Sequence, residues 1–312
     1  KQVENALEFS IKMHHGQTRK SGLPFVSHCI DVANILIDWN MDHTTVVSAL
    51  LHDVVEDTEV KLSDIEEEFG SDVALLVDGV TKVENIAFRS KKHKQAENFT
   101  KLFLSLARDL RVIIIKFADR LNNMETIQYL SSKKRKEIAL ETKEIFVPLA
   151  HRLGMAKLKW KLEDLSLKCL DLRAFNGIKK KIETSSRLNE DILSNAIKPI
   201  KSELNTYKIK SNIFGRYKSI SSIHRKIEKS GKKFEEIYDL YAIRIVVDKI
   251  EECYLALGVI HSIYPPIQDR FKDFIATPKT NGYQSIHTTV LTKDNRLTEF
   301  QIRTKDMDYT AE

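Results

Sequence analysis

Apolar residues recur at helical spacing through the first 170 residues of the chain. In residues 46–55 they fall on one side of a helix with about 3.6 residues per turn, and Thr44 and Thr45 are candidate N-cap residues. Similar patterns run through residues 32–37, 62–69, 99–106 and 138–149. Glycine and proline are scarce, with 10 and 6 in the chain. We therefore predict a mostly α-helical first domain.

The second half of the chain alternates strand-like and helix-like segments. Strands are indicated by β-branched residues or by the alternation of polar and apolar residues. The strand-like segments are residues 241–247, 286–291 and 297–304, and the helix-like segments are residues 218–228 and 251–263. Strands and helices that interleave in this way predict an α/β domain.

Length and composition favour two domains. The chain has 312 residues, more than one hydrophobic core usually covers. Hydrophobic residues make up 42% and charged residues 30%, an ordinary balance for a soluble globular protein. We place a helical domain at 1–170, a Lys- and Glu-rich helical connector at 171–207 and the α/β domain at 208–312.

Charge and cysteine content narrow the class of protein. Fifty Lys and Arg against 44 Asp and Glu give a net charge of +6, which suits phosphate-rich ligands but is weak evidence for nucleic acid. Cys29, Cys169 and Cys253 are far apart and predict no disulfide framework, so we expect a cytoplasmic protein. No apolar run is long enough for a membrane span, and no signal peptide is visible. Because the chain opens with Lys1 rather than Met, we expect a fragment.

The sequence HDVVED at residues 52–57 sets polar groups into an apolar stretch. Burying imidazole and carboxylate groups without partners is costly, and a divalent metal would compensate for that cost. On a helix, His52 and Asp53 lie about 100° apart and can converge on one ion. Glu56 and Asp57 lie one turn further on, where they would face an attacking water. The alternative is a core histidine that is satisfied by a carboxylate partner.

Two further segments favour the metal interpretation. His28 stands at the start of a predicted helix, and Asp119 is again a charge within an apolar stretch. On a helix, Asn123 and Thr126 share the face of Asp119. Together with the His-Asp pair, His28 and Asp119 supply two nitrogen and two oxygen ligands, a set that suits Mn, Fe or Zn more than Ca.

With these motifs the sequence resembles the HD superfamily and, within it, the long RelA/SpoT homologues, which make and degrade guanosine tetra- and pentaphosphate. The matching blocks are residues 15–22 (HGQTRKSG), 51–58 (LHDVVEDT), 118–124 (ADRLNNM) and 148–154 (PLAHRLG). The resemblance implies Mn²⁺ binding by His28, His52, Asp53 and Asp119, handling of the attacking water by Glu56 and Asp57, and nucleotide binding by Arg19, Lys20, Ser21, Asn123 and Thr126. Asn122 replaces a histidine that is common in the family, and Cys29 replaces a proline. Neither is an expected ligand, so we expect little effect.

The second half carries weaker signals of its own. The sequence GRYKS at residues 215–219 predicts a glycine turn that opens a helix, and a helix N-terminus with Arg and Lys suits phosphate. Asp239 stands at the start of a predicted strand, and Glu299, Gln301 and Arg303 share one face of another. Two carboxylates on neighbouring strands would hold Mg²⁺ against a triphosphate. Cross-strand pairing with arginine is the alternative.

These segments resemble the synthetase domain of the same proteins, which is nucleotidyltransferase-like with a mixed sheet. The matching blocks are residues 270–276 (RFKDFIA), 278–289 (PKTNGYQSIHTT) and 299–304 (EFQIRT). The implied reaction transfers pyrophosphate from ATP to the 3′-hydroxyl of GDP or GTP. The implied roles are Mg²⁺ binding for Asp239, assistance to the metal or acceptance of the hydroxyl proton for Glu299, ATP binding for Arg216 and Lys218, stacking on guanine for Tyr283, and contacts to the acceptor nucleotide for Lys279, Asn281 and His287. Ser221 and Phe274 stand where the family usually has tyrosine.

The interpretation is therefore a bifunctional alarmone hydrolase and synthetase with guanine nucleotides and ATP as partners and no membrane association. The resemblance also implies ribosome association of the full-length protein through C-terminal domains. One alternative is a hydrolase whose second domain only senses nucleotide. Another alternative is a nucleotidyltransferase–HD fusion that acts on tRNA or protein. Such enzymes usually carry Gly-Ser followed shortly by Asp-x-Asp. That pairing is missing here, because Gly70-Ser71 lies in the helical domain and Asp306-x-Asp308 stands alone. An RNA-binding module is poorly supported by the scattered basic clusters.

Overall fold

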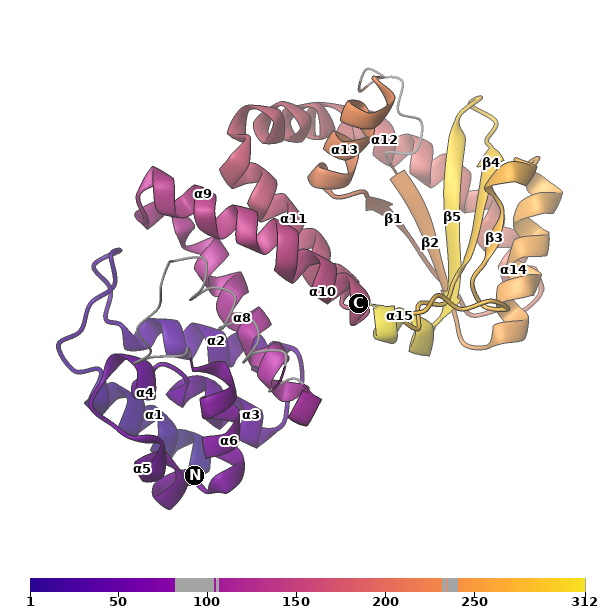
Figure 1. Cartoon of the computed structure of the whole chain (residues 1–312). Helices are drawn as coiled ribbons and strands as arrows, with labels where there is room; N and C mark the ends of the chain where they lie inside the picture. The colour runs from indigo at the N-terminus through magenta and orange to yellow at the C-terminus, as the bar shows by residue number, and fades with distance from the viewer. Residues whose placement is uncertain (82–103, 105–106, 232–233, 235–240, 312) are drawn as a thin grey trace. The chain divides into compact units, whose positions relative to one another are not determined.

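The computed structural model describes residues 1–81, 104, 107–231, 234 and 241–311 (Figure 1). Its contacts divide the chain into two compact units, Lys1–Arg135 and Lys136–Glu312. The domain limits expected after residues 170 and 207 stay predictions. Of the helix expected at 99–106, only residue 104 is described, and Asp239 lies outside the described residues.

The first unit is helical in its described part. Its elements are α1 (Gln2–Met13), α2 (Val26–Asp38), α3 (His43–Leu51), α4 (Val54–Asp57), α5 (Leu62–Phe69), α6 (Ser71–Val80), α8 (Arg111–Glu125) and the short η1 (Ile127–Tyr129). Fully buried side chains such as Leu36, Leu51, Leu76 and Phe117 come from α2, α3, α6 and α8. The apolar faces of these helices therefore meet in one core, as the helical periodicity predicted.

The helix expected around the HDVVED motif is in fact two helices. The carboxylate of Asp42 accepts hydrogen bonds from the backbone N–H of Thr45 at 3.0 Å and from its hydroxyl at 2.9 Å. Asp42 is therefore the N-cap of α3, and the expected caps Thr44 and Thr45 are wrong, because the preceding carboxylate already satisfies the first turn. His52 and Asp53 lie in the turn between α3 and α4 rather than inside one helix.

The second unit combines helices with one sheet. After α9 (Ser132–Glu141), which starts just before the unit boundary, its helices are the π-helix η2 (Thr142–Phe146), α10 (Val147–Arg152), α11 (Ala156–Leu170), α12 (Leu172–Thr206), α13 (Ile220–Ser230), α14 (Ile250–Ile263), η4 (Gln268–Arg270) and α15 (Lys305–Ala311). Its strands are β1 (Asn212–Tyr217), β2 (Tyr241–Val247), β3 (Lys272–Asp273), β4 (Ile286–Leu291) and β5 (Leu297–Thr304). The helical connector expected at 171–207 coincides with α12.

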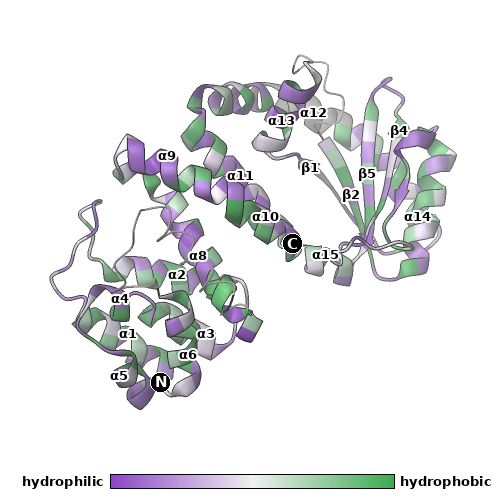
Figure 2. Ribbon diagram, in the orientation of Figure 1, coloured by the Kyte–Doolittle hydropathy of each residue, from purple (hydrophilic) through white to green (hydrophobic). Residues whose placement is uncertain are grey.

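The sheet has the strand order β1-β2-β5-β4-β3. Strands β2 and β5 are parallel, and the other neighbours are antiparallel, so the sheet is mixed. The three predicted strands coincide with β2, β4 and β5. Figure 2 shows hydrophobic and hydrophilic residues mixed along these strands. Buried side chains of α12 and α14, such as Ile200 and Ile260, pack against Ile243, Ile286 and Phe300 of the sheet. These two helices cover one face, and the other face carries the polar side chains.

The segment GRYKS is a strand end rather than the start of a helix. Gly215 and Arg216 belong to β1, and α13 begins only at Ile220, with Ser219 as its N-cap. A Cβ atom at Gly215 would lie 2.6 Å from the side chain of Leu193 in α12. The glycine thus leaves room for the Leu193 side chain of α12 against the strand and does not form a turn, which corrects our expectation.

The described residues contain no helix with the length and apolarity needed to cross a bilayer.

Candidate functional site

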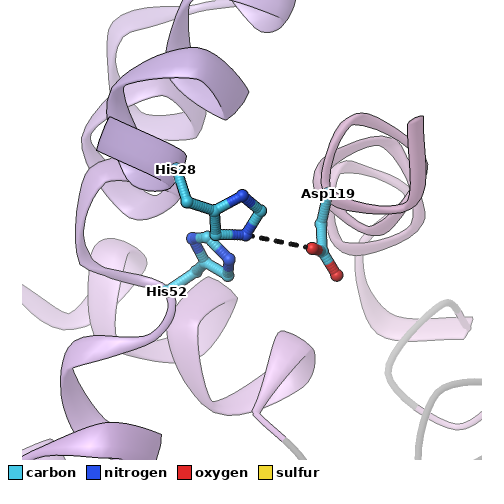
Figure 3. Close-up of side chains that lie close together, drawn as sticks. All are labelled: His28, His52 and Asp119. Carbon is cyan, nitrogen blue, oxygen red and sulfur yellow. Dashed lines mark ion pairs between the residues drawn. The ribbon is translucent and has the colours of Figure 1, made fainter. Parts of the chain in front are cut away.

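Side chains from three helical segments of the first unit converge on one point (Figure 3). The Nε2 atom of His28 on α2 lies 3.2 Å from Asp119 Oδ1 on α8 and 3.6 Å from Asp53 Oδ2. The Nε2 atom of His52 lies 3.2 Å from Asp53 Oδ1. Both imidazoles are almost fully buried, while the two carboxylates are partly exposed. The structure therefore brings together all four residues that the sequence predicted as metal ligands.

Hydrogen bonds hold both imidazoles in fixed orientations. The Nδ1–H of His28 donates to the side-chain oxygen of Asn122 at 2.7 Å, and the Nδ1–H of His52 donates to the carbonyl oxygen of Ala49 at 2.6 Å. Each ring thus presents Nε2 to the centre of the cluster. The Nε2 of His52 is buried and forms no hydrogen bond. An imidazole anchored through one nitrogen, with the other directed at carboxylates, is the arrangement of metal-binding histidines.

The electrostatics of the cluster favour a cation. Burial opposes the protonation of His28, but its contacts with Asp119 and Asp53 prevail and raise its pKa above the ordinary value. Burial alone would raise the pKa of Asp119, yet the hydrogen bond from His28 and the charge of Lys116 hold that pKa well below its usual range. Two buried imidazole nitrogens and two carboxylate groups fit a divalent metal ion, and a site for such an ion is what this donor set supports.

The loop between α1 and α2 carries the residues expected to bind nucleotide. The backbone N–H of Arg19 donates to the Leu23 carbonyl at 2.8 Å, and Gly22 has φ +85°, a conformation that favours glycine. This tight turn directs the Arg19 guanidinium to the side-chain oxygens of Asn122 at 3.3 Å and Asn123 at 3.0 Å. The Asn123 amide in turn donates a hydrogen bond to the carboxylate of Asp119, one turn earlier on α8. Arg19 and Asn123 therefore lie beside the metal cluster.

The other predicted hydrolase residues lie around this cluster in different ways. Thr126 donates from its hydroxyl to the carbonyl of Asn122 at 2.9 Å, one turn earlier in the chain. Lys20 is exposed, and Ser21 is half-buried in the same loop. Glu56 and Asp57 lie on α4, directly after the turn that holds two of the predicted metal ligands. They are absent from the groups of described residues whose ligand atoms come within metal-binding range of one another, and their expected role toward water stays a prediction.

The open face of the sheet carries a second polar cluster, centred on Glu299 of β5. Its carboxylate lies 3.0 Å from Lys218 Nζ and 3.2 Å from His287 Nδ1. A 2.7 Å hydrogen bond joins the other ring nitrogen of His287 to the Tyr283 hydroxyl. The Lys279 ammonium lies 5.0 Å from the centre of the Tyr283 ring. Five of the predicted synthetase residues are thus connected. Among the described residues Glu299 pairs with lysine and histidine rather than with arginine, so the alternative of arginine pairing is wrong for this residue.

Charge sets the protonation states in this second cluster. Burial would raise the pKa of Glu299, but His287 and Lys218 together lower it far below the ordinary carboxyl value. Burial, with the nearby charge of Lys272, lowers the pKa of Lys279. Burial also raises the pKa of the Tyr283 hydroxyl. The cluster therefore holds a carboxylate anion next to cations that are suited to phosphate oxygens.

Two predicted synthetase residues contact α10 and α11 instead. The guanidinium of Arg216 lies 3.8 Å above the centre of the Trp160 ring of α11. The Asn281 amide donates to the carbonyl of His151, at the end of α10, at 3.0 Å. Both contacts lie within the second unit. Asn281 also accepts a hydrogen bond from the backbone N–H of Tyr283 at 3.3 Å, so it remains next to the Glu299 cluster.

Comparisons with known proteins match both halves of the chain. A model of the HD domain matches residues 6–156, and a model described as a region found in RelA/SpoT proteins matches residues 215–312. The guanosine-3′,5′-bis(diphosphate) 3′-pyrophosphohydrolase of Spiroplasma citri is 42% identical over 313 residues, which cover 100% of this chain and 42% of that protein. The GTP pyrophosphokinase of Streptomyces antibioticus is 43% identical over 312 residues, 100% of this chain and 37% of that protein. The chain belongs to the RelA/SpoT family.

A solved structure also resembles this RelA/SpoT chain. It is described as a metazoan ortholog of SpoT that hydrolyzes ppGpp, and it matches with a TM-score of 0.41 and 27% identity over 53% of this chain and 93% of that chain. The chain spans less than half the length of the two curated relatives. The family, the helical HD domain and the mixed-sheet RelA/SpoT domain that we expected from the motifs are confirmed.

Two contact residues in this RelA/SpoT chain were missed from the sequence. Asn122 was noted only as a departure from the family, yet its side chain accepts from His28 and Arg19 and donates to Asp31 at 3.2 Å. Trp160, on which Arg216 stacks, carries no motif. Asn122 could have been found from its spacing, because it lies three residues after Asp119 and therefore on a similar face of the same helix. No sequence signal points to Trp160.

Proposed function

We propose that this chain is a bifunctional alarmone enzyme. Its first unit would hydrolyse the 3′-pyrophosphate of guanosine tetra- or pentaphosphate to give GDP or GTP and pyrophosphate, with Mn²⁺. Its second unit would transfer pyrophosphate from ATP to the 3′-hydroxyl of GDP or GTP, with Mg²⁺. The convergence of His28, His52, Asp53 and Asp119 on one point carries the proposal. The names of the two relatives, one a pyrophosphohydrolase and one a pyrophosphokinase, support both activities.

In the hydrolase, the four ligands would hold the cation, which lowers the pKa of water and draws charge from the phosphoryl oxygens. Glu56 or Asp57 would take a proton from the attacking water. Arg19 and Lys20 would neutralise the phosphates, and the contacts of Arg19 with two asparagines of α8 hold its guanidinium ready for this role. Ser21, Asn123 and Thr126 would position the nucleotide. The water oxygen would bond to the phosphorus attached to the 3′-oxygen, and the bond between that phosphorus and the 3′-oxygen would break. The 3′-oxygen would take up a proton, so that GDP or GTP and pyrophosphate are released.

In the synthetase, Arg216 and Lys218 would bind ATP, Tyr283 would stack on guanine, and Lys279, Asn281 and His287 would contact the acceptor nucleotide. Asp239 would bind Mg²⁺. For Glu299, the lowered pKa supports a role beside the metal over a role as a base, because a general base works best with a pKa near the working pH.

Hydrolysis is tested by incubating the purified chain with labelled guanosine tetraphosphate and Mn²⁺, with and without chelator. We expect release of pyrophosphate that the chelator abolishes. His52→Ala should abolish it too, because it removes a ligand. His43→Ala is the matched control, since His43 is exposed at the start of the same helix α3 and should leave the rate unchanged. Equal activity of the two variants would refute the hydrolase assignment.

Synthesis is tested in the His52→Ala background, where product is not degraded. ATP, GDP and Mg²⁺ should then give guanosine tetraphosphate. If no product forms while labelled nucleotide still binds the second unit, that domain is a sensor and the chain is a hydrolase only. Association of the full-length protein with ribosomes and a cytoplasmic location stay part of this proposal, and both are tested by fractionating cells that express the complete protein.

A further inference from the structure

Cys29 follows a metal ligand of the proposed hydrolase site and is fully buried on α2. Its Sγ atom belongs to a second group of potential ligands, in which Sγ, one ring nitrogen of His52 and one carboxylate oxygen of Asp53 all lie within 4.8 Å of one another. The first such group contains His28, His52 and Asp119. The two groups share His52 and lie side by side.

We infer that Cys29, His52 and Asp53 form a second coordination site for a thiophilic divalent cation such as Zn²⁺, Cd²⁺ or Co²⁺, overlapping the proposed Mn²⁺ site. The inference rests on the proposed metal site but not on its substrate.

The orientation of His52 supports this site independently of the cysteine. Its Nδ1–H is committed to the Ala49 carbonyl, whereas its buried Nε2 has no hydrogen-bond partner and lies 3.2 Å from Asp53 Oδ1, a ligand atom of this group. Ligand atoms around a tetrahedral zinc ion are roughly 3.5 Å apart, given bond lengths of about 2.0 to 2.3 Å. Sulfur, nitrogen and oxygen atoms that already lie within 4.8 Å therefore need to move by only about an ångström.

The chemistry of the donor set selects the cation. A sulfur ligand favours Zn²⁺, Cd²⁺ or Co²⁺, whereas Mn²⁺ prefers oxygen and nitrogen. When a thiophilic ion binds, the Cys29 thiol loses its proton to solvent and a sulfur–metal bond forms, with no change in oxidation state. Three protein ligands leave a fourth position for water. With Mn²⁺, Cys29 stays protonated and outside the coordination shell.

Competition follows from the shared ligands. A thiophilic cation held by Cys29, His52 and Asp53 occupies two of the four groups that would bind Mn²⁺. The two ions cannot both have complete ligand sets. We therefore expect Zn²⁺ to displace Mn²⁺ and to hold the hydrolase site in a different coordination.

Cobalt reports on the coordination directly. Metal-free protein is titrated with Co²⁺, and we expect visible d–d bands together with a near-ultraviolet charge-transfer band from thiolate to cobalt. Cys29→Ala should lose the charge-transfer band and keep d–d bands from the remaining ligands. Cys169→Ala, which removes the partly exposed cysteine of α11, is the control and should keep both. His28→Ala should keep the charge-transfer band, because His28 is not in this group.

The outcomes separate this inference from the proposed metal site. The d–d bands without a charge-transfer band in the unaltered protein would overturn the role of Cys29 and leave the metal site in place. The absence of any cobalt band would overturn both. Direct titrations with Zn²⁺ and Mn²⁺ provide a second measurement. Cys29→Ser should weaken Zn²⁺ binding by at least about tenfold, which is the smallest loss typical of removing a residue that only supports a metal ligand. The same variant should leave Mn²⁺ binding unchanged. Equal weakening of both ions would also overturn the inference.

Discussion

Replacing Asn122 with leucine should weaken Mn²⁺ binding by about tenfold to a hundredfold. The Asn122 side chain is buried and accepts the Nδ1–H of His28 at 2.7 Å and a guanidinium N–H of Arg19 at 3.3 Å, and its amide donates to Asp31 at 3.2 Å. Leucine has nearly the same size but none of these groups. It leaves the His28 N–H buried without an acceptor, at a cost of about 1 to 3 kcal/mol.

Two consequences follow for hydrolysis. His28 no longer has a fixed ring orientation, so the Mn²⁺ concentration for half-maximal activity should rise. Arg19 keeps only its contact with Asn123, so KM for guanosine tetraphosphate should also rise. Asn122→Asp preserves the acceptor for both groups and should restore most of the metal affinity, although it places a second carboxylate against Asp31.

The assay is a calorimetric Mn²⁺ titration together with hydrolysis rates over a range of Mn²⁺ concentrations. Gln128→Leu, an exposed position of η1 in the same unit, serves as the control for a general effect of added apolar surface. If Asn122→Leu bound Mn²⁺ within about threefold of the unaltered protein while folded, the orientation of His28 by Asn122 would contribute little, and the reasoning from the hydrogen bonds would be refuted.

Three further predictions concern stability and synthesis. Asp42→Ala should lower the free energy of unfolding by about 0.5 to 2 kcal/mol, measured as a lower urea midpoint of the first unit, because α3 loses its cap. Burial would raise the pKa of Asp42, but the hydrogen bonds from Thr45 prevail and lower it in the folded protein. The stabilisation from the Asp42 cap is therefore complete above the ordinary carboxyl pKa of about 3.9, and it is lost as the pH falls through the lower pKa of the folded protein. Trp160→Leu should raise KM for ATP by about two- to tenfold with kcat little changed, since Arg216 loses its stacking partner; an unchanged KM would contradict this. Glu299→Gln should lower synthesis by at least about a hundredfold and leave hydrolysis intact, in assays of the two activities run separately.

The strands that could be predicted are those with a strong local pattern. Strands β2, β4 and β5 are central or long, carry β-branched residues or clear alternation, and coincide with the predicted segments. Strand β1 was missed because Gly215 and the charged residues after it are typical of a turn. Its glycine serves packing against Leu193, a contact across the sequence that no local pattern reveals. Strand β3 has only two residues and offers no pattern to detect.

The convergence of the four predicted metal ligands could be foreseen from the sequence, but the local structure around two of them could not. A helix through His52 and Asp53 satisfied the apolar spacing, yet α3 ends before them and α4 begins after them. In a turn, Asp53 turns its two oxygens to different imidazoles, with Oδ1 3.2 Å from His52 and Oδ2 3.6 Å from His28. The Asp53 carboxylate thus contacts both imidazoles at once. On a continuous helix His52 and Asp53 would point about 100° apart, and the carboxylate would reach both imidazoles less directly.

Asn122 shows why a departure from a family motif has to be judged by its contacts. We expected little effect because the residue is not a ligand, and that argument counted only groups that would touch the metal. A metal site also depends on what fixes its ligands. An amide offers an acceptor and a donor on one side chain without adding charge, so Asn122 can receive N–H groups from His28 and Arg19 while its own N–H faces the Asp31 carboxylate. A neutral imidazole at this position has one acceptor and one donor and could not accept from both groups at once. The substitution is therefore compatible with the site because of its hydrogen-bonding capacity, which only the three-dimensional arrangement reveals.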